Sequence, residues 1–227
     1  MNQITKSMRI FTFLIIALFS FTISYSQESS IKIYGNGLYF NSAQEPTQFD
    51  YKPSLFNFDG LTLAYRKINT KENFHQFELG LDIKKSTKVD QAYNRFGAHI
   101  RYELGKHYDN LLFGAIDFQF GPSARVFYLD ERVNTLSYNQ FQVDRLQTGL
   151  NLGFFTNFEY DIGDRFYIEL NTSINGATFG LDFDKVANPN LTERQQKQGG
   201  FDFDAFGERL VRIGVGFVLN KTGVDGN

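Results

Sequence analysis

Residues 145–160 read RLQTGLNLGFFTNFEY and alternate between two kinds of side chain. The mostly apolar positions are Leu146, Leu150, Leu152, Phe154, Phe158 and Tyr160. The intervening polar and small positions include Arg145, Gln147, Gly149, Asn151, Gly153, Asn157 and Glu159. A helix does not keep a period of two for so long, so the stretch predicts a β-strand with one apolar and one polar face.

The same alternation recurs along the chain, most clearly in FGAHIRYEL at residues 96–104. Together these runs predict eight strands, at about Ser30 to Phe40, Gly60 to Ile68, Phe74 to Lys84, Tyr93 to Leu104, Leu111 to Tyr128, Phe141 to Tyr160, Arg165 to Asp182 and Phe206 to Asn220. An even count is typical of a single-chain bacterial membrane barrel. The sequence therefore predicts an all-β, eight-stranded antiparallel up-and-down transmembrane β-barrel.

The connections between these strands alternate in length. The longer ones are Asn41 to Asp59, Lys85 to Ala92, Leu129 to Gln140 and Phe183 to Ala205. The tight ones, rich in Asn, Asp and Gly, are Asn69 to Asn73, Gly105 to Asn110 and Asp161 to Asp164. Because short turns of such barrels face the periplasm and long loops face outside, we expect both ends of the barrel domain on the periplasmic side.

The N-terminal segment has the composition of a secretory signal. Lys6 and Arg9 precede the apolar stretch Ile10 to Phe21, and the small-residue sequence at residues 24–26 precedes Gln27. We expect residues 1–26 to be a cleavable signal peptide, since the apolar stretch is shorter than the ~20 residues of a spanning helix. Residues 27–220 would then form the barrel and residues 221–227 a periplasmic tail.

Composition narrows the function classes. The chain has no cysteine, which leaves no disulfide, zinc-thiolate or lipidated cysteine. Its formal net charge of −2 gives no sign of a nucleic-acid surface. A soluble lipid-binding barrel would invert the facing, with an apolar lumen and a wet exterior. The polar face argues against that alternative, because it is built from glycines and asparagines that suit a crowded lumen.

The chain resembles the small eight-stranded outer-membrane barrels of Gram-negative bacteria, of the OmpA-transmembrane, OmpX and OmpW type. The resemblance rests on strand pattern and loop asymmetry over the whole exported part. In the last strand, Arg212, Gly214, Phe217 and Leu219 match the signal that such families present to the barrel-assembly machinery. The resemblance implies that this machinery and outer-membrane lipid are partners; the tail from Lys221 to Asn227 departs from the usual terminal aromatic residue.

A barrel of eight strands is only wide enough to be filled by its own side chains. Opposite charges confined there must pair, because an unpaired desolvated charge would cost several kcal/mol. We therefore expect a salt-bridged plug, with a narrow or gated pore as the alternative. The expected lumen set is Arg66, Glu78, Asp82, Lys84, Arg95, His99, Arg101, Glu103, Asp117, Arg125, Arg145, Glu159, Glu169 and Arg212.

No enzyme site is predicted. The three histidines fall at the start of a strand (His75), in the middle of the lumen (His99) and in a periplasmic turn (His107), so none stands at the outer rim beside a nucleophile. His99 is expected to be a hydrogen-bond partner in the lumen. The chain contains no nucleotide-binding, zincin or calcium-loop motif, and no cofactor is expected.

Two matching segments flank the last long connection: Leu181-Asp182-Phe183-Asp184 and Phe201-Asp202-Phe203-Asp204. Their four carboxylates could gather a divalent cation, since Ca²⁺ is bound by clustered oxygen ligands. The preferred interpretation is a hairpin that continues above the membrane, with aromatic rings on one side and solvated aspartates on the other.

These features predict an integral outer-membrane barrel with a structural or interaction role through its external loops, which a protein partner could bind. Two other hypotheses stay open: slow transport of small solutes through the barrel, and service as an accessory barrel of a secretion or assembly machine.

Overall fold

The computed structural model describes residues 28–35, 38–41, 60–88, 91–112, 114–135, 142–187, 192–205 and 208–221. The expected signal peptide and most of the first long connection lie outside these residues, as does the tail beyond Lys221. No helix of the described residues is long and apolar enough to cross a membrane.

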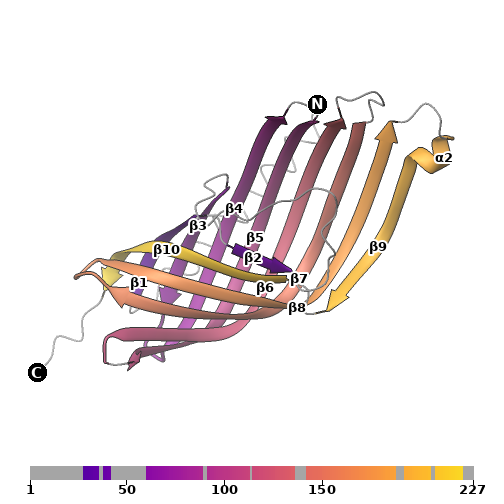
Figure 1. Cartoon of the computed structure of the whole chain (residues 1–227). Coiled ribbons are helices and arrows are strands. Elements are labelled where there is room, and N and C mark those ends of the chain that lie inside the picture. The colour runs from indigo at the N-terminus through magenta and orange to yellow at the C-terminus, as the bar shows by residue number, and fades with distance from the viewer. Residues whose placement is uncertain are drawn as a thin grey trace, which may run out of the picture.

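Eight strands close into a ring in which every neighbour is antiparallel, which confirms the predicted fold (Figure 1). The first and last strands of the ring pair with each other, from Glu28 with Lys221 to Tyr34 with Gly214. In ring order the strands are β1 (Glu28–Gly35), β3 (Gly60–Ile68), β4 (Asn73–Lys88), β5 (Gln91–Leu112), β6 (Ile116–Thr135), β7 (Gln142–Asp161), β8 (Phe166–Ala187) and β10 (Glu208–Lys221).

Three further elements extend the ring. Strand β2 (Leu38–Asn41) follows β1 and pairs with the start of β10. Strand β9 (Lys197–Ala205) precedes β10 and pairs with the upper part of β8. The short helix α2 (Glu193–Gln196) connects towards β9 behind a Thr192 capping box, in which the Gln195 side chain accepts from the Thr192 backbone.

The wall of the barrel is much taller on one side (Figure 1). Strands β5 to β8 have 20 to 22 residues, whereas β1 has 8 and β3 has 9. A tilted strand needs only about 9 to 11 residues to cross a membrane. The long strands, with β4 and β9 at their flanks, therefore continue as an open sheet beyond the closed ring.

Three connections expected to be long loops are largely strand instead. Strand β4 continues to Lys88 and β5 begins at Gln91, β6 continues to Thr135, and β8 and β9 pair between Ala177 and Ala205. In β4, β5 and β6, polar side chains above the apolar face hid these extensions, because both faces of the sheet are polar there and the alternation is lost. The aspartate segments form the hairpin that was the preferred interpretation.

The tight turn expected at Gly105 to Asn110 was also wrong. Strand β5 runs on to Leu112, the turn lies at residues 114–115, and β6 begins at Ile116, not at Leu111. The pairing of β5 with β6 is irregular between Tyr108 and Leu112, where Asn110 adopts a φ of 51°. Asparagine tolerates this left-handed conformation, so its turn signal marks an irregularity within the strand.

The expected facing agrees with the exposure of the side chains. Leu152 and Phe154 point outward and are exposed, while Asn151 is buried. The first strand, whose facing the sequence left open, follows the same rule, because Ile31 and Ile33 point outward and Lys32 and Tyr34 point inward. The outer surface of the ring is thus apolar and the interior is polar.

Candidate functional site

The interior of the ring holds two buried layers of charged side chains. The first layer is centred on Glu159 of β7, which pairs with Arg66 of β3 and with Lys32 of β1; its Oε1 lies 3.0 Å from Lys32 Nζ. Lys32 also pairs with Glu169 of β8. The Arg66 guanidinium reaches Glu28 as well, at 2.5 Å, so β1, β3, β7 and β8 are joined across the bore.

The second layer is centred on Arg212 of β10. Its Nη2 donates to Oε1 of Glu78 on β4 at 2.6 Å and lies 3.7 Å from Glu103 on β5. Arg101, also on β5, lies 2.7 Å from Glu103. The Gln76 amide donates to Glu103 Oε2 at 3.1 Å, so this layer also joins strands that are far apart in the ring.

Amide side chains connect the two layers. Arg212 Nε donates to Asn171 at 2.9 Å, and Asn171 in turn donates to Asn157. Asn157 donates to Gln119 at 3.1 Å, and Gln119 donates to Glu159 at 2.8 Å. This chain of hydrogen bonds satisfies the buried polar groups along it and connects the two layers.

The buried charges balance. Among the described residues, the buried cations Lys32, Arg66, Arg101 and Arg212 face the buried carboxylates Glu78, Glu103, Glu159 and Glu169. Their formal charges, four of each sign, sum to zero. Because a desolvated charge without a counter-charge is costly, this equality stabilises the closed interior.

Two tyrosines fill the space between the layers and explain the glycines of the last strand. Tyr34 lies over Gly214, where an added Cβ would stand 2.5 Å from its ring, and the Arg212 guanidinium stacks 4.1 Å from its centre. Tyr167 lies over Gly216 in the same way, and its ring centre is 4.6 Å from the Arg66 guanidinium. Glycine at both positions admits a large ring against the wall.

Ten of the fourteen expected lumen residues fall into two groups. Arg66, Glu78, Arg101, Glu103, Glu159, Glu169 and Arg212 lie in the two buried layers. Asp82, Arg95 and Arg145 instead lie on the inner face of the tall wall, where they are partly exposed. On this face, positive and negative side chains alternate from strand to strand. Glu131 lies 3.6 Å from Arg95 and 3.9 Å from Arg145, and Arg145 lies 3.1 Å from Asp184.

Three further expected residues lie at intermediate positions. Arg125 stacks on Phe127, with 5.8 Å to the ring centre, and its Nε lies 3.0 Å from the Asn151 amide when the oxygen of that amide faces it. The His99 ring lies against Gly80, and the hydrogen-bond partner expected for it is not found among the described residues. Asp117 accepts a hydrogen bond from the Asn110 backbone at 2.7 Å. The Lys84 side chain lies outside the description.

The sequence missed several members of the interior. Lys32, Tyr34, Gln76, Gln119 and Tyr167 are all buried and bonded within it. Lys32 and Tyr34 could have been found, because Ile31 and Ile33 alternate with them in the first strand. The glutamines and Tyr167 carry no charge and gave no signal beyond their place in the alternation.

The residues expected to form the assembly signal alternate across the wall. Arg212 and Gly214 face the interior, as described above. Phe217 faces outward with its ring centre 5.1 Å from that of Phe166, and Leu219 is exposed beside it. All four residues therefore have places in the barrel itself.

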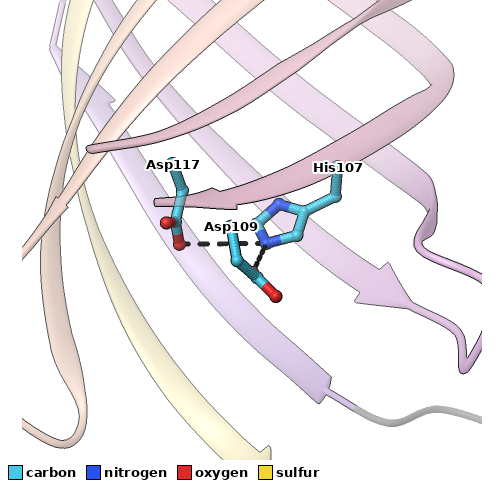
Figure 2. A group of neighbouring side chains, drawn as sticks. All are labelled: His107, Asp109 and Asp117. Atoms are coloured by element: carbon cyan, nitrogen blue, oxygen red, sulfur yellow. Dashed lines mark hydrogen bonds and ion pairs between the residues drawn. The ribbon is translucent and has the colours of Figure 1, made fainter. Parts of the chain in front are cut away.

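A histidine and two aspartates meet near the turn between β5 and β6 (Figure 2). His107, expected in a periplasmic turn, lies within β5 and is buried. Its Nε2 lies 2.6 Å from Asp109 and 3.8 Å from Asp117. This is the one group with metal-ligand geometry among the described residues, and the four aspartates of the β8–β9 hairpin do not form another.

Hydrogen bonds around His107 oppose metal binding. Gln119 Nε2 lies 2.9 Å from His107 Nδ1, and the same amide is oriented by Glu159 and Asn157. Nδ1 therefore accepts from this amide, and Nε2 donates to Asp109. A metal at Nε2 would have to displace the proton of Nε2 and reverse the amide. The group is best described as a hydrogen-bonded cluster at the edge of the barrel interior.

Comparison with known proteins supports the fold. No protein-family model matches the sequence, and no curated protein matches it. A major outer membrane protein from Thermus thermophilus has a similar structure, with a TM-score of 0.51, 8% identity, and coverage of 85% of this chain and 99% of that one. The fold is that of an outer-membrane barrel. The attachment invasion locus protein Ail of Yersinia pestis also matches, with a TM-score of 0.45, 8% identity, and coverage of 85% and 98%.

Proposed function

We propose that the chain is an integral outer-membrane barrel that acts through structure or interaction and not through catalysis or free transport. The observation that carries the proposal is the contrast between its two faces. The outer face of the ring exposes large apolar side chains such as Leu63, Leu79, Leu152 and Ile213, while the interior buries balanced charges. A soluble protein would place these side chains the other way round.

The closed interior supports a plug. Ion pairs that join opposite strands of the ring, such as those of Arg66 with Glu159 and of Arg212 with Glu78, occupy the bore. At the lower end of the bore, Ile68, Phe74 and Phe155 form a small buried apolar cluster. Passage of a solute would require several buried ion pairs to separate together, which makes slow transport the weaker alternative.

The tall wall supports a role in interaction. Strands β4 to β9 carry it well beyond the closed ring (Figure 1), at the end where the chain makes its longer connections. We assign that end to the outside and the short turns to the periplasm. Under this assignment the wall stands where a protein partner could reach it, and the last strand offers its signal to the assembly machinery from the periplasmic side.

Two measurements test the proposal. The protein should need detergent for recovery from membranes, and unheated samples should migrate differently from boiled ones in detergent gels, because a closed barrel has no free edge from which to unfold. Recovery as a soluble protein without detergent would reject the membrane assignment.

The plug is tested separately in planar bilayers. We expect no steady conductance from the folded protein, since its bore is filled. Reproducible channel steps of large conductance would favour transport instead. Co-purification from native membranes would identify a machine for which this chain is an accessory barrel.

A further inference from the structure

One row of side chains on the outer face of the tall wall is strongly basic. Residues paired across neighbouring strands project to the same face, and the pairings place one residue from each of six strands in a single row. In order from β4 to β9 the row is Lys85, Asn94, Arg132, Asp144, Lys185 and Lys197. The row faces outward. Its members on β4, β5 and β8 each lie two positions from an outward-facing apolar residue, namely Ile83, Phe96 or Phe183, and alternate residues of a strand share a face.

The excess of positive charge in the outer row is not typical of the wall, as the adjacent row on the inner face shows. There Arg95, Glu131, Arg145 and Asp184 alternate in sign and pair with one another. The outer row has four cations and a single carboxylate, and that carboxylate, Asp144, is 2.9 Å from Arg132. Lys85, Lys185 and Lys197 form no ion pair within the described part of the chain.

Two of these lysines oppose each other directly. Lys185 of β8 and Lys197 of β9 are cross-strand partners, and both are exposed. Like charges at opposite positions of an antiparallel pair destabilise it. An anion bound between them would remove this repulsion, and the described part of the protein supplies none there.

The surface below the basic row is apolar. The next outward-facing row, two residues closer to the closed ring on each strand, contains Ile83, Phe96, Leu146 and Phe183. Asp130 is its one charged member. A separation of two residues is about 7 Å along a strand. A hollow of about 310 Å³ crosses the boundary between the two rows. It is lined by Ile83 and Phe96, by Lys85, Asn94, Arg95 and Arg132, and by one carboxylate, that of Asp130.

We propose that this outer row, hereafter the basic row, binds the phosphate groups of lipid headgroups in the outer leaflet, with the hollow holding the adjoining part of one lipid. The occupant must be apolar on one side and anionic on the other within about 7 Å, which describes a phosphorylated lipid at the membrane surface. A soluble acidic protein would match the lysines but not the apolar row. The inference rests on the proposed membrane function and on the outward assignment of the tall wall.

The row has the reach for more than one phosphate. Neighbouring strands are about 4.8 Å apart, so Lys85, Arg132 and Lys185, each two strands from the next, recur about every 10 Å. Because strands of such barrels tilt by about 40°, the row crosses the headgroup layer obliquely. Phosphates at several depths can therefore meet a cation.

The test compares two triple variants in neutral-detergent micelles. The first, Lys85→Gln/Lys185→Gln/Lys197→Gln, removes three cations from the basic row and leaves the pair of Arg132 with Asp144 intact. The matched control, Lys67→Gln/Lys71→Gln/Lys106→Gln, removes three lysines at the short-turn end. Binding of lipid A, a glycolipid with two phosphates, is measured by native mass spectrometry, with its dephosphorylated form and inorganic phosphate as comparison ligands.

We expect about a fivefold loss of affinity, equivalent to ~1 kcal/mol, for each lysine that a bound lipid contacts. This gives roughly a 25-fold loss in the first variant where the two phosphates of one lipid meet two of the three lysines. The control should lose much less, and dephosphorylated lipid should bind the native protein no better than lipid A binds the first variant. Equal losses in the two variants would overturn the site, as would equally tight binding of dephosphorylated lipid. Displacement by equimolar inorganic phosphate, or equal binding of a soluble polyglutamate, would overturn the choice of lipid.

The outcome can be separated from that of the proposed function. Heat-modifiable migration of both variants shows that each barrel is folded. A barrel that folds in detergent but does not discriminate between the lipids rejects the basic row alone, whereas a chain that needs no detergent rejects the membrane assignment itself.

Discussion

Replacing Arg66 with methionine tests the charge balance inside the barrel. Arg66 is almost completely buried and pairs with Glu159 and Glu28, and its Nε donates to Ser30 at 2.9 Å. Arg66→Met keeps most of the side-chain volume but leaves four buried carboxylates facing three buried cations. Removing one partner of a buried pair costs about 3 to 5 kcal/mol, so we expect the free energy of unfolding to fall by that amount.

The assay is urea unfolding in neutral detergent, followed by the fraction of protein that keeps its unheated migration. The double variant Arg66→Met/Glu159→Gln restores the balance with three charges of each sign, and it should be more stable than the sum of the two single changes implies. Arg132→Met is the matched control, because Arg132 is 54% exposed and its pair with Asp144 should contribute less than about 1 kcal/mol. A loss below about 1 kcal/mol for Arg66→Met would refute the view that the interior is desolvated.

Three other changes address the lipid face, the packing and the cluster around His107. Leu152→Arg should cost roughly 2 to 4 kcal/mol if residue 152 lies near the bilayer midplane; normal assembly of this variant, measured by its yield of folded barrel in membranes, would show that the facing is inverted. Gly216→Ala places a Cβ 2.0 Å from the Tyr167 ring and should cost about 1 to 3 kcal/mol in urea unfolding, whereas Gly200→Ala, with open space around it, should have no such effect. Zn²⁺ should not raise the melting temperature, because His107 donates from Nε2; a rise that disappears in Asp117→Asn would contradict this.

The sequence predicted the ring well because the pattern of each strand reports a strong physical constraint. Lipid on one side and a crowded bore on the other force the alternation that is visible from Leu150 to Phe154. Where that constraint ends, prediction fails. Above the apolar face neither side of the sheet meets hydrocarbon, so residues 85–88 and 129–135 read as loop although they are strand.

The interior was predicted in composition but not in arrangement. Glu78 and Arg212 were each identified because they are charged residues at inward-facing positions of their strands. Their contact depends on which strands face each other across the bore, and the sequence does not show that arrangement. Tyr167 was missed because an aromatic residue near a strand end reads equally as part of an interfacial girdle. Its inward direction follows from its place beside Gly216, a partner 49 positions later in the chain.

The pairing of the first strand with the last has a consequence for biogenesis. The contacts that close the interior join residues far apart in the chain: Lys32 and Glu169 are separated by 137 positions, Glu78 and Arg212 by 134, and Arg66 and Glu159 by 93. None of these contacts can form during early synthesis, because one partner does not yet exist. Without β10, the remaining strands would form an open sheet with two unpaired edges and with Glu78 lacking Arg212, a species prone to aggregation. The barrel therefore closes in one cooperative step, after the last strand has been made. Proteins that keep the chain unfolded until that step would determine what fraction of it folds instead of aggregating.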